Sequence, residues 1–128
     1  MEPIPREVDE VAKQVVDAAF AVHQALGPGL LESVYEACLA HELRKRGLNV
    51  ETQVVLPVVY DGVELEAGLR LDLLVNGCVV VELKAVDHLL DVHRAQVMTY
   101  LKLTGHRLGL LINFNVPLIK DGVKRIAL

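Results

Sequence analysis

Residues 70–84 of the chain read Arg-Leu-Asp-Leu-Leu-Val-Asn-Gly-Cys-Val-Val-Val-Glu-Leu-Lys, two apolar runs separated by Asn76-Gly77. This pattern predicts two β-strands joined by a tight turn, because Asn-Gly favours the positive φ angles that hairpin turns require. Three charged residues, Asp72, Glu82 and Lys84, stand inside runs that otherwise belong in a protein core. Burying a charge costs free energy unless the charge is paired or coordinates a metal. The hairpin therefore predicts a site that holds these charges.

The pairing register of the hairpin decides which charged side chains share a face, because successive residues of a strand point to opposite faces. A two-residue turn at Asn76-Gly77 would place Asp72 opposite Val81 and direct it away from Glu82 and Lys84. Both faces of the hairpin would then mix charge with apolar side chains.

A longer loop separates the charged side chains from the apolar ones. A three-residue loop that ends in a left-handed Gly77 pairs Leu74 with Cys78 and places Arg70 opposite Glu82. One face is then wholly aliphatic and consists of Leu71, Leu73, Val79, Val81, Leu83 and Ala85. The other face brings together Arg70, Asp72, Glu82 and Lys84. The hydrophobic pattern favours this register.

Two carboxylates on one face need something that relieves their repulsion, which is roughly 4 kcal/mol for a pair about 4 Å apart at an effective dielectric near 20. A hard divalent cation such as Mg²⁺ or Mn²⁺ would do so, because carboxylate oxygens are the ligands it prefers. The alternative is a structural cluster of salt bridges, with Asp72 or Glu82 paired to Arg70 or Lys84. Spacing alone leaves both interpretations open.

In the hairpin, Asp72 is followed ten residues later by Glu82-Leu83-Lys84. This arrangement resembles the metal-binding signature of the PD-(D/E)XK nuclease superfamily. Residues 29–35, Gly-Leu-Leu-Glu-Ser-Val-Tyr, resemble the GxxExxY motif of one small bacterial branch. Residues 96–100, Gln-Val-Met-Thr-Tyr, resemble the QxxxY helix of RecB-like members. The resemblance covers about residues 11–125, and Leu71 stands where the superfamily name has proline.

The resemblance implies a restriction-endonuclease-like α/β (α+β) fold and hydrolysis of phosphodiester bonds with Mg²⁺ or Mn²⁺ as cofactor. The metal ligands that it implies are Glu32, Asp72, Glu82 and the backbone carbonyl of Leu83. The catalytic residues that it implies are Asp72, Glu82, Lys84 and Gln96, and the substrate contacts are Arg70, Tyr100 and Tyr35.

Some of these residues also have simpler interpretations. Glu32 lies near the start of a predicted helix, where a carboxylate is stabilised by the helix dipole. Gln96 and Tyr100 are four residues apart and share a helical face, which is also typical of a helix boundary where a tyrosine keeps its hydroxyl in water. The five histidines have no HxxxH or HExxH spacing, so we do not expect a zinc site. Cys38 and Cys78 are interpreted as small buried thiols.

Periodic apolar residues predict the secondary structure. Spacings of three and four from Val8 to Ala25 predict an amphipathic helix over about residues 5–26, whose coiled-coil-like seam could also form a homodimer interface. Further patterns predict helices over 30–46 and 91–104, and strands over 50–60, 63–75, 78–86, 108–114 and 123–127. This order predicts one domain over residues 1–128, with a mixed sheet of about four to five strands flanked by helices.

Composition limits the classes of protein. The chain has 128 residues, of which 52% are apolar, and it contains no apolar run long enough to span a membrane, so we expect a soluble cytoplasmic domain. Its net charge of −4 argues against strong non-specific binding to DNA. Basic residues nevertheless cluster at Arg44-Lys45-Arg46, at Arg94, Lys102 and Arg107, and at Lys120, Lys124 and Arg125.

Two functions from different classes fit these observations. One is a metal-dependent nuclease, with DNA favoured over RNA as the nucleic-acid partner. The other is a nuclease-fold module that binds nucleic acid or protein without cleavage. The complete set of Asp72, Glu82 and Lys84 favours the nuclease, and the acidic net charge favours the binding module.

Overall fold

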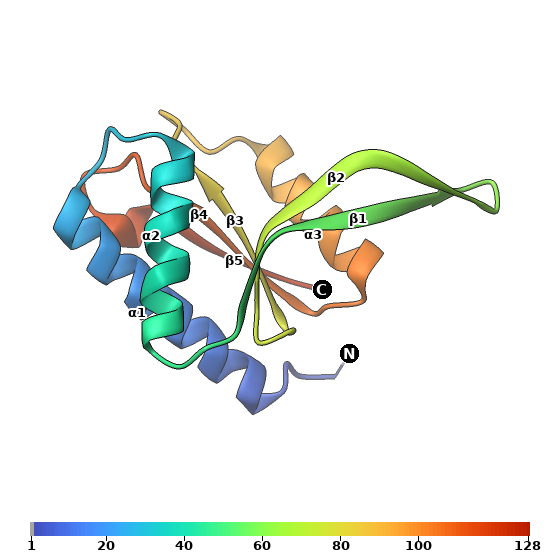
Figure 1. Ribbon diagram of the computed structural model, residues 1–128, viewed down its shortest axis with the longest axis horizontal. Helices are drawn as coiled ribbons and strands as arrows, with labels where there is room; N and C mark the ends of the chain where they lie inside the picture. Colours follow the sequence, from blue (N-terminus) through green and yellow to red (C-terminus); the bar gives the residue numbers. More distant parts are fainter. Residues whose placement is uncertain (1) are drawn as a thin grey trace.

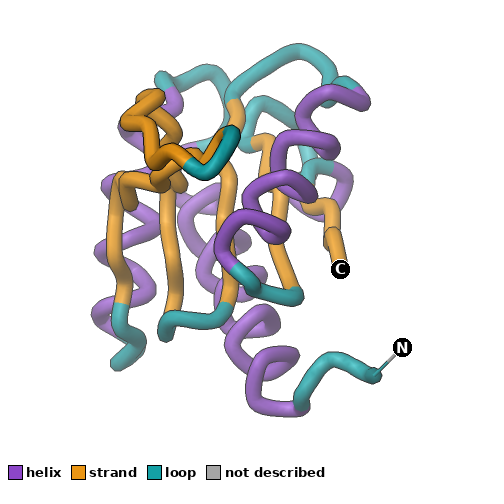
Figure 2. The backbone as a smooth tube through the Cα atoms, turned by 90° about the vertical axis from the view of Figure 1, so that its right-hand side faces the viewer, coloured by secondary structure: helices purple, strands orange, loops and turns teal. Residues whose placement is uncertain are grey.

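A five-stranded mixed sheet with helices on both faces forms the protein (Figures 1 and 2). This computed structural model describes residues 2–128, apart from the side chain of Ala67. The helices are α1 (Arg6–Leu26), α2 (Glu32–Lys45) and α3 (Asp91–Thr104), with a short 3-10 helix at Ile119–Asp121. The strands are β1 (Val50–Tyr60), β2 (Val63–Val75), β3 (Val79–Lys84), β4 (Leu108–Asn113) and β5 (Val123–Ala127). Their order in the sheet is β1-β2-β3-β4-β5, and β4 runs parallel to β3 while the other neighbours are antiparallel.

The predicted elements and the mixed sheet are confirmed, with differences at some element ends and in the pairing of β2 with β3. β3 ends at Lys84, two residues before the predicted end, because the Asn113 side chain forms hydrogen bonds with both backbone groups of Val86. Its Nδ2 donates to the Val86 carbonyl (2.9 Å), and its Oδ1 accepts from the Val86 N–H (3.1 Å). α2 begins at Glu32 and not at residue 30, since Leu31 has an extended backbone.

The two faces of the sheet carry separate cores. α1 and α2 cover one face, where Val15 and Leu39 are fully buried with Leu83. α3 covers the other face, where Val97 and Leu101 pack with the strands. The α3 contact is close, because a Cβ added to Gly109 of β4 would lie 2.7 Å from Val97 Cγ1.

The seam of α1 faces the protein's own core. Four of its members, Val11, Val15, Ala18 and Val22, are buried there, and Ala25 is exposed. The homodimer interface suggested by the heptad-like spacing is therefore not a free surface, because the same side chains already pack against α2 and the sheet.

The turn between β2 and β3 differs from the predicted loop. Leu74 pairs with Val80 and not with Cys78, because the three loop residues are 76–78 instead of 75–77. Asn76 (φ 50°) and Gly77 (φ 63°) both have left-handed backbones. Asn76 is held in this position by Asn49, whose N–H donates to Asn76 Oδ1 and whose carbonyl accepts from the Asn76 N–H, both at 2.8 Å.

The corrected register keeps Asp72, Glu82 and Lys84 on one face, as predicted. The shift is by two residues, and a shift by two does not by itself move a side chain to the other face. Continued from Leu73↔Val81, the pairing brings Asp72, and not Arg70, opposite Glu82.

β1 and β2 continue beyond the sheet as a two-stranded arm, seen at the right of Figure 1. β2 pairs with β3 only over residues 73–75, whereas it pairs with β1 along most of its length. Where β1 and β2 leave β3 they twist, so that side chains of one strand alternation pack on opposite faces of the sheet. Leu73 packs in the core under α1 and α2, while Leu71 packs in the core under α3. Leu71 therefore does not belong to the aliphatic face predicted for it, and the reversal occurs at Asp72.

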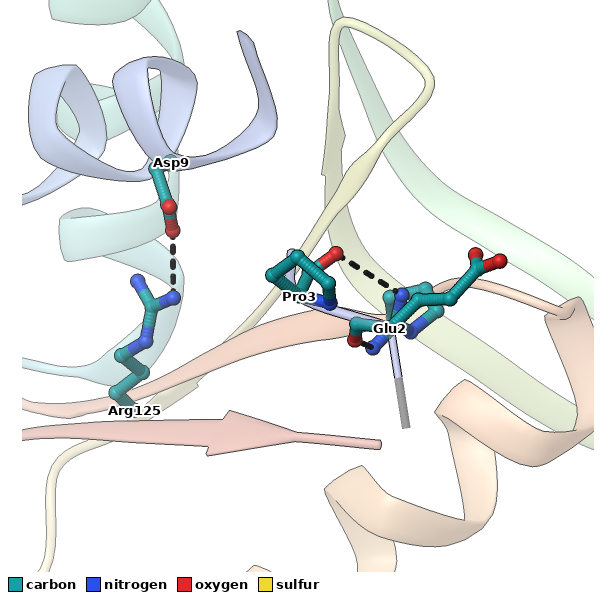
Figure 3. A network of polar contacts seen from close by, with 5 residues as sticks. Glu2, Pro3, Asp9 and Arg125 are labelled. Atoms are coloured by element: carbon teal, nitrogen blue, oxygen red, sulfur yellow. Dashed lines mark hydrogen bonds and ion pairs between the residues drawn. The ribbon is translucent and has the colours of Figure 1, made fainter. Parts of the chain in front are cut away.

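Two arginines bind residues near the ends of the chain, and Figure 3 shows one of them, Arg125, with Asp9. Arg107 donates to the carbonyls of Glu2 (2.6 Å), Pro3 (3.4 Å) and Leu128 (2.9 Å), and Arg125 forms a salt bridge with Asp9. These two members of the predicted basic clusters thus have structural partners. Within residues 2–128, every helix is too short or too polar to cross a lipid bilayer.

Candidate active site

Asp72 and Glu82 face each other where β2 and β3 separate. The backbone pairing between the strands ends at Leu73↔Val81. Beyond this pair, hydrogen bonds from backbone N–H groups to side-chain carboxylates connect the two strands. Glu82 Oε1 accepts from the Asp72 N–H (3.1 Å), and Asp72 Oδ2 accepts from the Leu83 N–H (2.8 Å). These reciprocal bonds hold two carboxylates side by side in a fixed orientation.

The Glu82 carboxyl is the most perturbed group of the pair. Glu82 is only 3% exposed. Burial, and after it the negative charge of Asp72, raises the pKa of Glu82 from 4.5 to about 9. Lys84 opposes this effect only in part, and the salt bridges within residues 2–128 include neither carboxylate. Two adjacent carboxylates without an ion-pair partner are a donor set that fits a hard divalent cation.

The backbone at Leu83 adds an oxygen to this donor set. The N–H and C=O of one strand residue point to the same side. Since the Leu83 N–H donates to Asp72, the Leu83 carbonyl also points toward the gap between β2 and β3. The next carbonyl along, that of Lys84, points to β4 and accepts from the Phe114 N–H at 2.9 Å. The predicted role of the Leu83 carbonyl is thus compatible with its position.

Glu32 lies beside the pair without joining it. Burial and then the charge of Asp72 raise the pKa of Glu32, while Lys84 lowers it, so both residues lie near its carboxyl. Yet no three His, Cys, Asp or Glu side chains among residues 2–128 stand close enough to hold one ion. Glu32 is exposed at the start of α2 and does not complete a shell around Asp72 and Glu82 in this structure.

Two residues at the site were not predicted from the sequence. Gln53 of β1 donates from Nε2 to Glu36 Oε1 (2.5 Å), and the same nitrogen lies 3.5 Å from Asp72 Oδ1. Burial raises the pKa of Glu36, the hydrogen bond from Gln53 lowers it, and the charge of Asp72 raises it further. Glu36 follows Glu32 by one helical turn, which was the only available signal, and nothing marks Gln53 in an alternating strand.

α3 supplies the opposite wall of the site. Gln96, Tyr100, Lys84 and His93 line a cleft of about 540 Å³. Burial, then the charges of Glu82 and Asp72, raises the pKa of Tyr100, and a hydrogen bond with Gln96 opposes the shift. The structure therefore brings the predicted Gln96, Tyr100 and Lys84 to one cleft, and Tyr100 lies near enough to Glu82 and Asp72 for their charges to raise its pKa.

Two predicted substrate contacts lie elsewhere. Tyr35 is fully buried, its hydroxyl donates to the Gly27 carbonyl (2.6 Å) and accepts from the Leu30 N–H (3.1 Å), and its ring stacks on Phe114. A fully buried side chain does not reach a substrate, so the prediction for Tyr35 is wrong. Arg70 is exposed on β2 opposite Val55 of the arm, away from its expected position beside Glu82.

Comparison with known families gives the class of protein. Residues 9–126 match the family described as the PD-(D/E)XK nuclease superfamily. Because the match covers most of the 128 residues, the chain belongs to this superfamily of nucleases, whose members typically use divalent metals. Comparisons with curated proteins and with solved structures gave no match.

Proposed function

We propose that the protein is a metal-dependent nuclease that hydrolyses phosphodiester bonds, with DNA as the favoured substrate. The observation that carries the proposal is the pair of adjacent carboxylates, Asp72 and Glu82, with the Leu83 carbonyl pointing to the same gap. The GxxExxY-like residues 29–35 and the QxxxY-like residues 96–100 support assignment to the bacterial GxxExxY branch, and the likeness to RecB-like members supports DNA.

Mg²⁺ or Mn²⁺ would be held by Asp72, Glu82 and the Leu83 carbonyl, with Glu32 adding negative charge nearby. When bound, the ion supplies Lewis-acid polarisation of a phosphate and a more acidic water molecule. The protein's contribution is to orient the ligands, which the reciprocal backbone bonds of the two carboxylates do before any ion arrives.

The remaining residues of the cleft have roles that follow from their chemistry. Lys84, on the same face as Glu82, orients the attacking water or accepts its proton and stabilises negative charge on the phosphate. Gln96 and Tyr100 donate hydrogen bonds to a phosphate oxygen or to the water without adding charge.

Cleavage assays test this proposal. Labelled single- and double-stranded DNA and RNA are incubated with wild type, Asp72→Ala and Lys84→Ala, with Mn²⁺ or with EDTA. We expect cleavage of DNA by wild type with Mn²⁺ only, loss of metal binding in D72A, and at least about 100-fold slower cleavage in K84A with metal binding retained. Cleavage that persists in D72A, or absence of Mn²⁺ binding to wild type in calorimetry, would contradict the proposal.

A binding module without catalysis is the second candidate. The net charge of −4 and the structural use of Arg107 and Arg125 favour the form of this module that binds a protein, because both reduce the positive charge available to hold a duplex. Wild type that binds Mn²⁺ but cleaves no labelled nucleic acid would favour this function, and retention of the uncleaved DNA would distinguish a nucleic-acid-binding module from a protein-binding one.

A further inference from the structure

Gln53 has an unusual backbone for a residue within a strand. Its φ angle is 51°, in the left-handed region that sterically favours glycine. The other two non-glycine residues with positive φ within residues 2–128, Asp61 and Asn76, lie in hairpin turns, where such angles are common. The pairs Thr52↔Leu73 and Val54↔Leu71 continue one register on either side. Gln53 therefore stands opposite Asp72 with no residue inserted.

The side chain of Gln53 connects two carboxylates from different elements. Its Nε2 donates to Glu36 Oε1 of α2 (2.5 Å) and contacts Asp72 Oδ1 of β2 (3.5 Å). The other oxygen of Asp72, Oδ2, accepts from the Leu83 N–H (2.8 Å). Both oxygens of Asp72 thus face an N–H group, one on the β3 backbone and one on an amide that Glu36 anchors.

We propose that Gln53, anchored by Glu36, is a positioning residue that fixes the Asp72 carboxylate for binding of a divalent cation. The inference rests on the proposed metal-dependent function. A purely structural role does not require the amide, because glycine adopts this backbone with less strain. Glutamine at this position adds only the side chain, and that side chain reaches the two acids.

Gln53→Gly tests the role of the side-chain amide separately from that of the left-handed backbone. The variant keeps the left-handed φ and loses both contacts to the carboxylates. We expect the Kd for Mn²⁺, measured by calorimetry, to rise about 10- to 100-fold, as on removal of other residues that orient metal ligands. Far-UV circular dichroism and the thermal midpoint in EDTA should stay close to wild type.

Asp61→Gly is the matched control. It also replaces a left-handed non-glycine residue, of φ 54°, in the turn that ends the arm. We expect the Mn²⁺ affinity of D61G to equal that of wild type. Equal losses of affinity in D61G and Q53G would assign the effect to the backbone and overturn the inference.

A double-mutant cycle tests the anchor. If Glu36 acts through Gln53, Glu36→Ala lowers Mn²⁺ affinity in wild type by more than it does in the Q53G background. Equal losses in the two backgrounds would mean that Glu36 acts by charge alone and would overturn its role as anchor.

The outcomes separate this inference from the proposed function. Absence of Mn²⁺ binding to wild type would refute the proposed function, whereas equal binding by wild type and Q53G would refute only the role of Gln53. Should Q53G not fold, Gln53→Asn serves instead. Asparagine tolerates a left-handed backbone, and its shorter side chain holds the amide further from Glu36 and Asp72.

Discussion

The Glu82 carboxyl makes the stability of the protein depend on pH. Its pKa is about 9 in the folded protein, against 4.5 as the ordinary value, because of burial and then the charge of Asp72. Between these two values the folded state keeps a proton that the unfolded state has lost, so stability falls as pH rises. The hydrogen bond from the Asp72 N–H and the charge of Lys84 favour the ionised form of Glu82, but they offset burial and the charge of Asp72 only in part.

We therefore expect the urea midpoint in EDTA to fall from pH 5 to pH 9 in wild type and to fall much less in Glu82→Gln, whose amide does not ionise. Addition of Mn²⁺ at pH 8 should restore the midpoint of wild type and leave that of E82Q nearly unchanged. The same slope in both proteins would contradict the assignment of the buried proton to Glu82.

Two tyrosines distinguish stability from function at single residues. Tyr35→Phe removes the hydroxyl that bonds Gly27 and Leu30, and we expect a loss of about 1–2 kcal/mol in unfolding free energy with unchanged cleavage. Tyr100→Phe should slow cleavage with a smaller effect on stability, because Tyr100 lines the cleft and the charges of Glu82 and Asp72, after burial, raise the pKa of its hydroxyl. Urea unfolding and the DNA assay measure both effects, and a reversed pattern would contradict these roles.

The sequence identified residues wherever alternation along a strand or spacing along a helix decides their direction. Strand alternation is the reason that Asp72, Glu82 and Lys84 were predicted together, and helical spacing is the reason that Gln96 was predicted with Tyr100. Gln53 was not predictable, because glutamine gives no local sign of a left-handed backbone. Tyr35 was wrongly assigned, since the motif shows its spacing from Glu32 but not that its ring packs on Phe114.

At the scale of elements, local signals set the bounds and distant contacts set the register. Asp61-Gly62 and Gly105 mark element ends, and β1, β2, α3 and β5 have the predicted limits. The loop at 76–78 was misplaced because Asn49, far away in sequence, binds Asn76. The end of β3 was misplaced for a similar reason, the contact between Asn113 and Val86.

The packing of α3 on β4 places Gln96 and Tyr100 at the site. A Cβ at Gly109 would lie 2.7 Å from Val97 Cγ1, so Gly109→Ala pushes the helix away. We expect a loss of about 1–3 kcal/mol in stability and slower cleavage, with Mn²⁺ affinity nearly retained because β2 and β3 hold the carboxylates. Calorimetry and the cleavage assay on the folded variant check this, and wild-type cleavage by G109A would contradict it.

At the scale of the whole molecule, the α1 seam packs in the core of its own chain. Because Val15 is fully buried in the chain's own core, we expect Val15→Ala to lower the unfolding free energy by about 2 kcal/mol. Its sedimentation mass should equal that of wild type, which we expect near the 14.1 kDa of one chain. A dimeric wild type that V15A converts to a stable monomer would instead assign the seam to an interface.

The arm has a consequence for limited proteolysis. Between Arg46 and Arg70 the chain contains no lysine or arginine, so trypsin has no cleavage site on the outer part of the arm, residues 54–69, and Arg70 at the base of the arm is the first site that it meets. The same part exposes Glu64 and Glu66 to a glutamate-specific protease. Digestion with the two enzymes in parallel therefore distinguishes local opening of the arm from opening of the domain that carries the carboxylates.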